Sequence, residues 1–303
     1  MKIIYRIFIL FVVGIFVNLS LQAQELEPRS LTNVPIGSNF AVSGYAYSQG
    51  NILLDPSIPI ENLDAKINTL LGGYVRSINF FGLSSKVDLM VPFATGHWTG
   101  VYEGVDTATA RTGFGDPSVR LSVNLLGAPA LKPSEYSKYQ QKTIIGLSIR
   151  VFVPLGQYNP DKLLNLGSNR WTIALKAGLS QKFKNWVLEF YLGSWFFTQN
   201  NDFFGGNTLT QKPYFTGLVH LIRSLPKNMW LAANLGYGIG GQGVVNGELK
   251  DNRMSTFRFG LTYAVSFAKS HTVKLNTFSS SKLEAGPDFD SFVILYSYRW
   301  NRK

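Results

Sequence analysis

Alternation of apolar and polar residues along segments of nine or more positions is the feature that most constrains this chain. Between positions 119 and 125 every second residue is apolar, and Arg120, Ser122 and Asn124 stand between them. A repeat of two residues is that of a β-strand with one apolar and one polar face. The pattern is clearest at 85–95, 117–126, 170–182 and 253–268.

Weaker versions of the same pattern bring the predicted number of strands to twelve. We predict strands at 39–48, 66–78, 84–95, 116–126, 142–154, 169–182, 186–198, 213–224, 228–240, 253–268, 271–279 and 290–300. Each is long enough to cross a bilayer as a tilted strand, which takes about 9–11 residues. A soluble sandwich of such strands would leave open edges, whereas a closed barrel pairs every backbone group. The sequence therefore predicts an all-β, transmembrane, antiparallel up-and-down β-barrel of about twelve strands, with ten or fourteen as alternatives.

The connections alternate between short and long, which supports a barrel independently. Those after the second, sixth, eighth and tenth predicted strands are short, and most of the others are long and rich in Gly, Asn and Asp. Outer-membrane barrels have short periplasmic turns and long outer loops. The connection at 127–141 is long where a short one is expected, and we predict a helical turn near 133–139.

The beginning of the chain resembles a secretory signal. Lys2 and Arg6 precede an apolar run at 7–17, and the sequence becomes small and polar up to Ala23. An N-terminal membrane anchor is the alternative, but eleven apolar residues are too few to span about 30 Å of hydrocarbon. We expect a signal peptide at 1–23, an N-terminal periplasmic segment at 24–38 and a barrel at 39–303. The expected location is the outer membrane of a Gram-negative bacterium.

Composition narrows the class further. The 303-residue chain has 14% aromatic and 16% charged residues and no cysteine. It has no apolar stretch of about 18 residues, which excludes a helical membrane protein. Its formal charge of +11 is spread thinly, and an exported chain does not meet nucleic acid, so we expect no nucleic-acid partner. Aromatic residues near strand ends suggest membrane-interface girdles, although a soluble aromatic core is the alternative.

Several stretches resemble the outer-membrane transporter family named for the "MetA pathway of phenol degradation". They lie at 26–29, 33–40, 55–57, 115–117, 122–131, 153–158, 161–163, 165–171, 196–198 and 201–206, and span nearly the whole mature chain. The resemblance implies a barrel-forming transporter with a link to aromatic compounds. The final strand ends in aromatic residues up to Trp300, similar to strands that the barrel-assembly machinery recognises. We therefore expect that machinery and outer-membrane lipids as partners.

The polar face of the predicted strands is basic, and this guides the functional hypothesis. The lumen and solute-path candidates are Lys86, Asp88, Arg120, Arg150, Arg170, Lys176, Glu189, Arg258, Lys274 and Arg299. Charged side chains set selectivity in narrow pores, so a basic lumen favours anions. We predict passive passage of small solutes, anionic or aromatic ones among them. The alternative is that these charges pair with one another and fill a closed barrel that acts in structure or recognition through its outer loops.

Other functional hypotheses have weaker support in the sequence. The outer-loop candidates are Asp161, Lys162, Asn201, Asp202, Phe203 and Phe204, which suit either an entrance, a cation site or ordinary turns. His97, placed just past a strand end, is the candidate base of a membrane-embedded hydrolase, a distant alternative without an accompanying Ser motif. The three histidines have no metal-ligand spacing and cysteine is absent, so we expect no metal, no cofactor and no enzyme activity.

Overall fold

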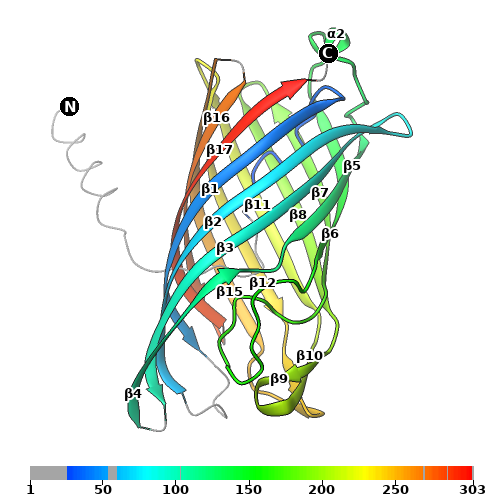
Figure 1. Cartoon of the computed structure of the whole chain (residues 1–303). Coiled ribbons are helices and arrows are strands. Elements are labelled where there is room, and N and C mark those ends of the chain that lie inside the picture. The colour runs from blue at the N-terminus through cyan, green and yellow to red at the C-terminus, as the bar shows by residue number, and fades with distance from the viewer. Residues whose placement is uncertain (1–25, 54–59, 103, 269, 285, 302–303) are drawn as a thin grey trace, which may run out of the picture.

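The structure, a computed structural model, describes residues 26–53, 60–102, 104–268, 270–284 and 286–301. The predicted signal peptide at 1–23 and the family-like motif at 55–57 lie outside the described residues. Figure 1 shows tilted strands wound around one axis, with α2 (Pro133–Tyr136) at one end and β9 (Asn200–Phe203) at the other. We call these the short-turn end and the long-loop end.

Twelve strands close into an antiparallel barrel, and the first and last of them pair, with Ser38 opposite Asn301. The strands are β1 (Ser38–Leu53), β2 (Ile60–Phe80), β3 (Leu83–Tyr102), β5 (Ser118–Leu126), β6 (Thr143–Phe152), β7 (Thr172–Phe183), β8 (Trp186–Phe197), β11 (Tyr214–Leu225), β12 (Met229–Gly240), β15 (Met254–Phe267), β16 (His271–Lys282) and β17 (Gly286–Asn301). The predicted fold and all twelve predicted strands are confirmed. The wall formed by β1, β2 and β3 extends further toward the long-loop end than predicted.

The outer face of the barrel is apolar and the inner face is largely polar. Leu231, Leu235 and Tyr237 of β12 are exposed on the outside. Trp230 and Asn234, at alternate positions of the same strand, are buried on the inside. An apolar outer band around a polar interior is typical of a barrel that spans a membrane.

No helix among the described residues is long and apolar enough to cross a membrane.

Tight turns join the strands at the short-turn end. Lys227 and Asn228, between β11 and β12, both have φ of 58°, and Phe81 and Gly82, between β2 and β3, have φ of 51° and 84°. Two consecutive residues with positive φ give a turn whose twist matches that of the flanking strands. The predicted helical turn in the longer connection is confirmed as α2, which begins at Pro133.

The alternation does not reveal β4 (Val105–Phe114). β4 pairs with residues 93–102 of β3, and β5 pairs with residues 85–90 of the same strand. Pro117 lacks a backbone N–H, and it lies in the break between β4 and β5. Alanine and threonine dominate β4, so it has no large apolar face for the pattern to detect.

Four short strands in the long loops form a second sheet at the long-loop end, in the order β14 (Glu248–Leu249), β13 (Gly243–Val245), β10 (Asn207–Gln211) and β9. Figure 1 places β9 and β10 below the barrel, on the side opposite β4.

Candidate functional site: the barrel interior

The first described residues lie inside the barrel. Leu26 and Leu31 are buried in an apolar cluster with Ile144, Tyr191 and Leu218 of the inner wall. We expected residues 24–38 to form a periplasmic segment, but the described part of this range packs against the inner wall. The segment folds inward because burial of the apolar side chains of Leu26 and Leu31 is favourable. We name residues 26–36 the N-terminal segment.

Hydrogen bonds from the wall hold the backbone of the N-terminal segment. Lys86 Nζ donates to the Ser30 carbonyl oxygen, and Asn124 Nδ2 donates to the Leu31 carbonyl oxygen at 3.0 Å. Ser30 Oγ donates to the Tyr191 hydroxyl at 2.9 Å. Backbone groups that would be costly to bury without partners are satisfied in this way.

Arg29 is a second anchor of the N-terminal segment. Its backbone N–H donates to Glu189 Oε2 at 2.8 Å, and its guanidinium donates to Ser224 Oγ at 3.1 Å. The guanidinium also lies 5.1 Å from the centre of the Trp230 ring. Burial lowers the pKa of Arg29, and the Glu189 carboxylate opposes this effect.

Glu27 joins the N-terminal segment to a network of charges on the wall. Arg120 Nη1 donates to Glu27 Oε2 at 2.7 Å, and Arg120 Nε donates to Asp88 Oδ2 at 2.7 Å. Arg150 Nη2 lies 3.6 Å from Asp88 Oδ1. Burial by itself would raise the pKa of Glu27, but nearby cations, Arg120 foremost, outweigh burial and hold the pKa well below 4.5. Glu27 is therefore a carboxylate at neutral pH.

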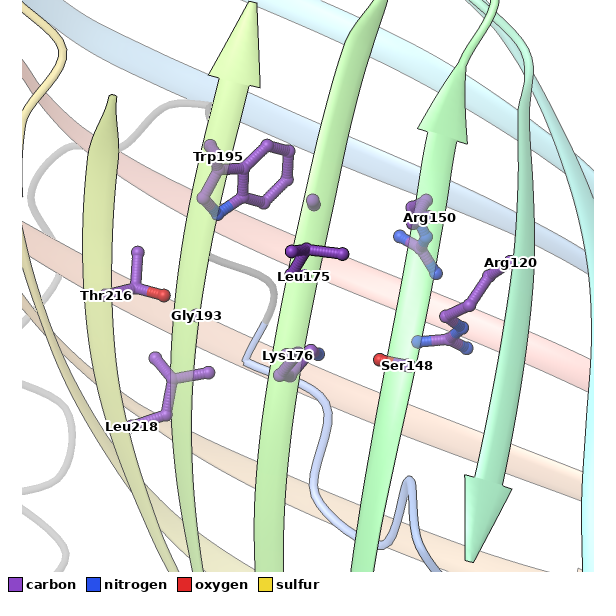
Figure 2. A pocket seen from close by; sticks show the side chains of 10 residues that line it. Arg120, Ser148, Arg150, Leu175, Lys176, Gly193, Trp195, Thr216 and Leu218 are labelled. Carbon is purple, nitrogen blue, oxygen red and sulfur yellow. The ribbon is translucent and has the colours of Figure 1, made fainter. Parts of the chain in front are cut away.

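A cavity lies on the inner wall beside this network. It is lined by Arg120, Ser148, Arg150, Ala174, Leu175, Lys176, Gly193, Trp195, Thr216 and Leu218. Arg120 and Arg150 are paired in register on β5 and β6. Figure 2 shows them next to each other, with Lys176 beside them and Trp195 and Leu218 further along the wall. Three cations thus share one cavity with an aromatic and an aliphatic surface.

Aromatic rings and guanidinium groups continue from the cavity toward the long-loop end. Arg150 lies 5.9 Å from the centre of the Phe152 ring, which stacks on Trp195 with centroids 5.6 Å apart. Arg170 lies 4.6 Å from the centre of the Phe197 ring. Burial lowers the pKa of Arg170 to about 10, so its guanidinium stays charged at neutral pH. A cation over the face of an aromatic ring is attracted to that ring, and the edge of the ring stays available for other contacts.

The connection between β6 and β7, which we name the mouth loop (residues 153–171), folds over the long-loop end of the barrel. Its Leu164 and Leu166 pack against the buried Trp98 and Phe289 of the wall. This apolar contact narrows the opening from one side.

Asp116 fastens the mouth loop to the wall. Its two carboxylate oxygens accept hydrogen bonds from Gly156 N at 2.9 Å and from Ser168 N and Oγ at 2.8 and 2.6 Å. A Cβ atom at Gly167 would lie 2.7 Å from Gly156, so glycine is required for this close approach of the backbone.

The ten lumen candidates occupy the interior or its mouth. Arg170 precedes β7 and belongs to the mouth loop, whereas we expected it on a strand. Lys274 Nζ lies 5.9 Å from the centre of the Trp230 ring, and Arg258 is only 8% exposed. Arg299 alternates with Tyr298 and Trp300, which are exposed on the outer face.

The outer-loop candidates come together at the long-loop end. Asp161 and Lys162 are exposed in the mouth loop, Asn201, Asp202 and Phe203 belong to β9, and Phe204 begins the 3-10 turn η1 (Phe204–Gly206). Tyr158 of the mouth loop donates to the Asp202 carbonyl at 2.9 Å, which links the two loops. Among the described residues, no three His, Asp or Glu side chains are grouped so that they would hold a metal ion.

Two features of the interior escape sequence reasoning. His220 Nδ1 is 2.8 Å from Asn234 Oδ1, and Asn234 Nδ2 donates to Thr262 Oγ1 at 2.9 Å, so a polar chain crosses three strands. Its members stand at inward positions, but nothing in one sequence shows that these positions meet. Glu27 is the other feature, and its only signal is its place in a family-like motif.

His97 does not stand past a strand end. It is exposed on the outer face within β3, in the part of the strand that pairs with β4, opposite Ala110. The expected position was wrong because β3 continues to Tyr102 instead of ending near residue 95.

The sequence profile of the family described as "Putative MetA-pathway of phenol degradation" matches residues 37–286. The chain belongs to this family. The match covers most of the barrel and confirms the resemblance seen in the sequence. No curated protein matches the chain.

Solved structures of outer-membrane barrels share the fold. The COG4313 outer membrane channel from Pseudomonas putida F1 is 19% identical, with a TM-score of 0.77, over 91% of this chain and 100% of that one. The transport unit of the autotransporter AIDA-I from Escherichia coli is 9% identical, with a TM-score of 0.53, over 92% and 94%. The β domain of the Bordetella autotransporter BrkA is 12% identical, with a TM-score of 0.52, over 87% and 100%. These likenesses establish the barrel architecture.

Proposed function

We propose that this protein is an outer-membrane channel for the passive passage of small anions, aromatic carboxylates among them. The observation that carries the proposal is the cavity in which Arg120, Arg150 and Lys176 lie beside Trp195 and Leu218. Side-chain charges at close quarters set which ions enter a narrow pore. Apolar walls with a few charged groups are also typical of small-molecule sites.

The balance of charge in the interior supports an anionic solute. Arg120, Arg150 and Lys176 face the cavity, and the carboxylates of Asp88 and Glu27 offset part of their charge. An anion entering this region gains attraction in surroundings less polar than water. The name of the Pseudomonas putida protein, an outer membrane channel, supports the same class of function by analogy.

Current recording in planar bilayers tests this proposal. The refolded wild-type protein is expected to give discrete conductance steps and a reversal potential that shows anion preference in a salt gradient. Arg150→Gln should lower the anion-to-cation permeability ratio roughly threefold, because one cation of the cavity is lost. Arg253→Gln is the matched control, since Arg253 is half exposed and pairs with Glu284 at 3.6 Å away from the cavity. Unchanged selectivity in Arg150→Gln would contradict the proposal.

A closed barrel that acts through its outer loops is the second candidate function. The packing of Leu164 and Leu166 over the long-loop end and the N-terminal segment inside the lumen favour it. Electrical silence in several preparations of verified, folded barrel would favour this candidate over the channel.

The proposed partners follow from the same surfaces. The apolar outer face suits outer-membrane lipids, and the final strand, with Tyr296, Tyr298 and Trp300 exposed on that face, suits the barrel-assembly machinery. Deletion of residues 292–303 should block assembly in cells while leaving secretion across the inner membrane intact, and this is measured by cell fractionation.

A further inference from the structure

Arg120 belongs to two features at once. It lines the cavity, and it donates a hydrogen bond to Glu27 of the N-terminal segment. Leu218 likewise lines the cavity and belongs to the apolar cluster that contains Leu26. Residues 26 and 27, which we name the tip, therefore border the cavity through both their charged and their apolar contacts.

We propose that Arg120 is a carboxylate-binding site, that Glu27 fills this site in the empty channel, and that the carboxylate of a solute replaces Glu27 there. The inference rests on the proposed function, and it names the chemical group by which the solute is recognised. The ligand class is a small monocarboxylate with an apolar or aromatic body, which would lie against Trp195 and Leu218.

The tip is held differently from the rest of the N-terminal segment. Several backbone groups within residues 29–36 are hydrogen-bonded to the wall, for example the Leu31 carbonyl oxygen, which accepts from Asn124 Nδ2 at 3.0 Å. Glu27 is joined to the wall through its side chain, which is 32% exposed. Pro28 lies between the two parts, and its ring fixes φ at that point. Release of the Glu27 side chain from Arg120 therefore breaks none of the hydrogen bonds that residues 29–36 make with the wall.

The exchange is balanced in charge. Arg120 keeps its 2.7 Å hydrogen bond to Asp88, and the arriving carboxylate takes the position that Glu27 leaves. Loss of a carboxylate partner from a buried arginine would strongly destabilise the folded protein. A replacement ligand avoids this cost. The released Glu27 side chain is already partly exposed, so water can solvate it. A neutral aromatic solute offers no such replacement, so the site discriminates by charge.

Binding of sodium benzoate, measured by calorimetry on the folded full-length barrel in detergent, tests the exchange. An internal competitor weakens the apparent affinity by the inverse of the fraction of molecules in which the site is accessible. Glu27→Gln removes the competing charge, and we expect it to bind benzoate about tenfold more tightly than wild type, as for an accessible fraction of roughly one tenth. Benzyl alcohol, which has the same ring without the carboxylate, should gain nothing from the substitution.

Glu248→Gln is the matched control. Glu248 is exposed on β14 and pairs with Lys250 at 3.3 Å, so the same chemical change occurs far from the cavity. This variant should bind benzoate as wild type does. A shift in gel mobility between heated and unheated samples verifies that each variant is folded.

Hydrogen–deuterium exchange of wild type provides a readout that needs no substitution. Benzoate should speed exchange in peptides that contain the tip and leave peptides of residues 30–36 unchanged. If benzoate binds wild type and Glu27→Gln equally and the tip exchanges at the same rate in both conditions, the exchange proposal is wrong, even where the protein conducts anions. A wild-type channel that shows no anion preference would instead overturn the proposed function.

Discussion

At the scale of single residues, the interior is shaped by charges that the strand register brings together. Arg120 stands opposite Arg150 on one side and opposite Asp88 on the other. Like charges directly opposite each other destabilise a sheet, and opposite charges stabilise it. Asp88 contacts both arginines, and Glu27 adds a second carboxylate at Arg120. The two carboxylates therefore allow two arginines to occupy adjacent inward positions.

The lowered pKa of Glu27 leads to a prediction for pH dependence. A carboxyl group whose pKa is lowered by folding contributes to stability at pH values above its ordinary pKa of 4.5. This contribution is lost as the pH falls through the pKa of the folded state. The ratio of the conductance of Glu27→Gln to that of wild type should hold steady from about pH 7 to about pH 5, where Glu27 is a carboxylate, and should approach one in more acidic solution, where both side chains are uncharged. The charged groups near Glu27 that share this field are Lys86, Asp88, Arg120, Lys176 and Lys274. A ratio that changes around neutral pH would contradict the assignment to Glu27.

At the scale of elements, the long connections do more than join strands. The apolar residues of the mouth loop pack against Trp98 and Phe289, and its backbone donates hydrogen bonds to Asp116. Tyr158 and Asn169 link it further to the loop that contains β9, through Asp202 and Asn200. The loops thus form one connected structure whose position sets the width of the long-loop end.

Asp116→Ala should loosen the mouth loop. Removal of a carboxylate that accepts three hydrogen bonds should lower the free energy of local opening by about 2–4 kcal/mol. Hydrogen–deuterium exchange of residues 153–171 should become faster, and conductance should rise without a change in ion selectivity. Asp161→Ala, at an exposed position of the same loop, is the control and should leave both quantities unchanged.

At the scale of the whole molecule, closure of the sheet and the apolar outer band act together. Pairing of β1 with β17 closes the ring of twelve barrel strands, so each of these strands has a neighbour on both sides for its backbone groups. A charge placed on the outer band should therefore be costly. Leu235→Arg is expected to lower the free energy of unfolding in lipid vesicles by about 2–4 kcal/mol, as measured with guanidinium chloride.

Leu249→Arg provides the comparison for this prediction. Leu249 is 54% exposed on β14, in the sheet formed by the long loops. The same substitution there should change the unfolding free energy by less than about 0.5 kcal/mol, as at ordinary surface positions. Equal costs at the two positions would show that Leu235 does not face lipid.

The sequence by itself determined the strands, their inward and outward faces and the family. The reason is that these properties are local: a period of two residues, a short turn or a motif is complete within a few positions. The positions of Lys86, Arg120, Arg150 and Lys176 on the inner face follow from the same pattern, since alternate residues of a strand must share a face.

Only the tertiary structure decided what the interior contains. The contact between Glu27 and Arg120 joins residues 93 positions apart, and the contact between Arg29 and Glu189 joins residues 160 apart. The inward fold of the N-terminal segment and the packing of the mouth loop likewise depend on the closed wall that surrounds them. β4 also required the structure, because pairing with β3 specifies it rather than any apolar face of its own. Such contacts leave no periodic signal in a single chain, because each arises from closure of the barrel.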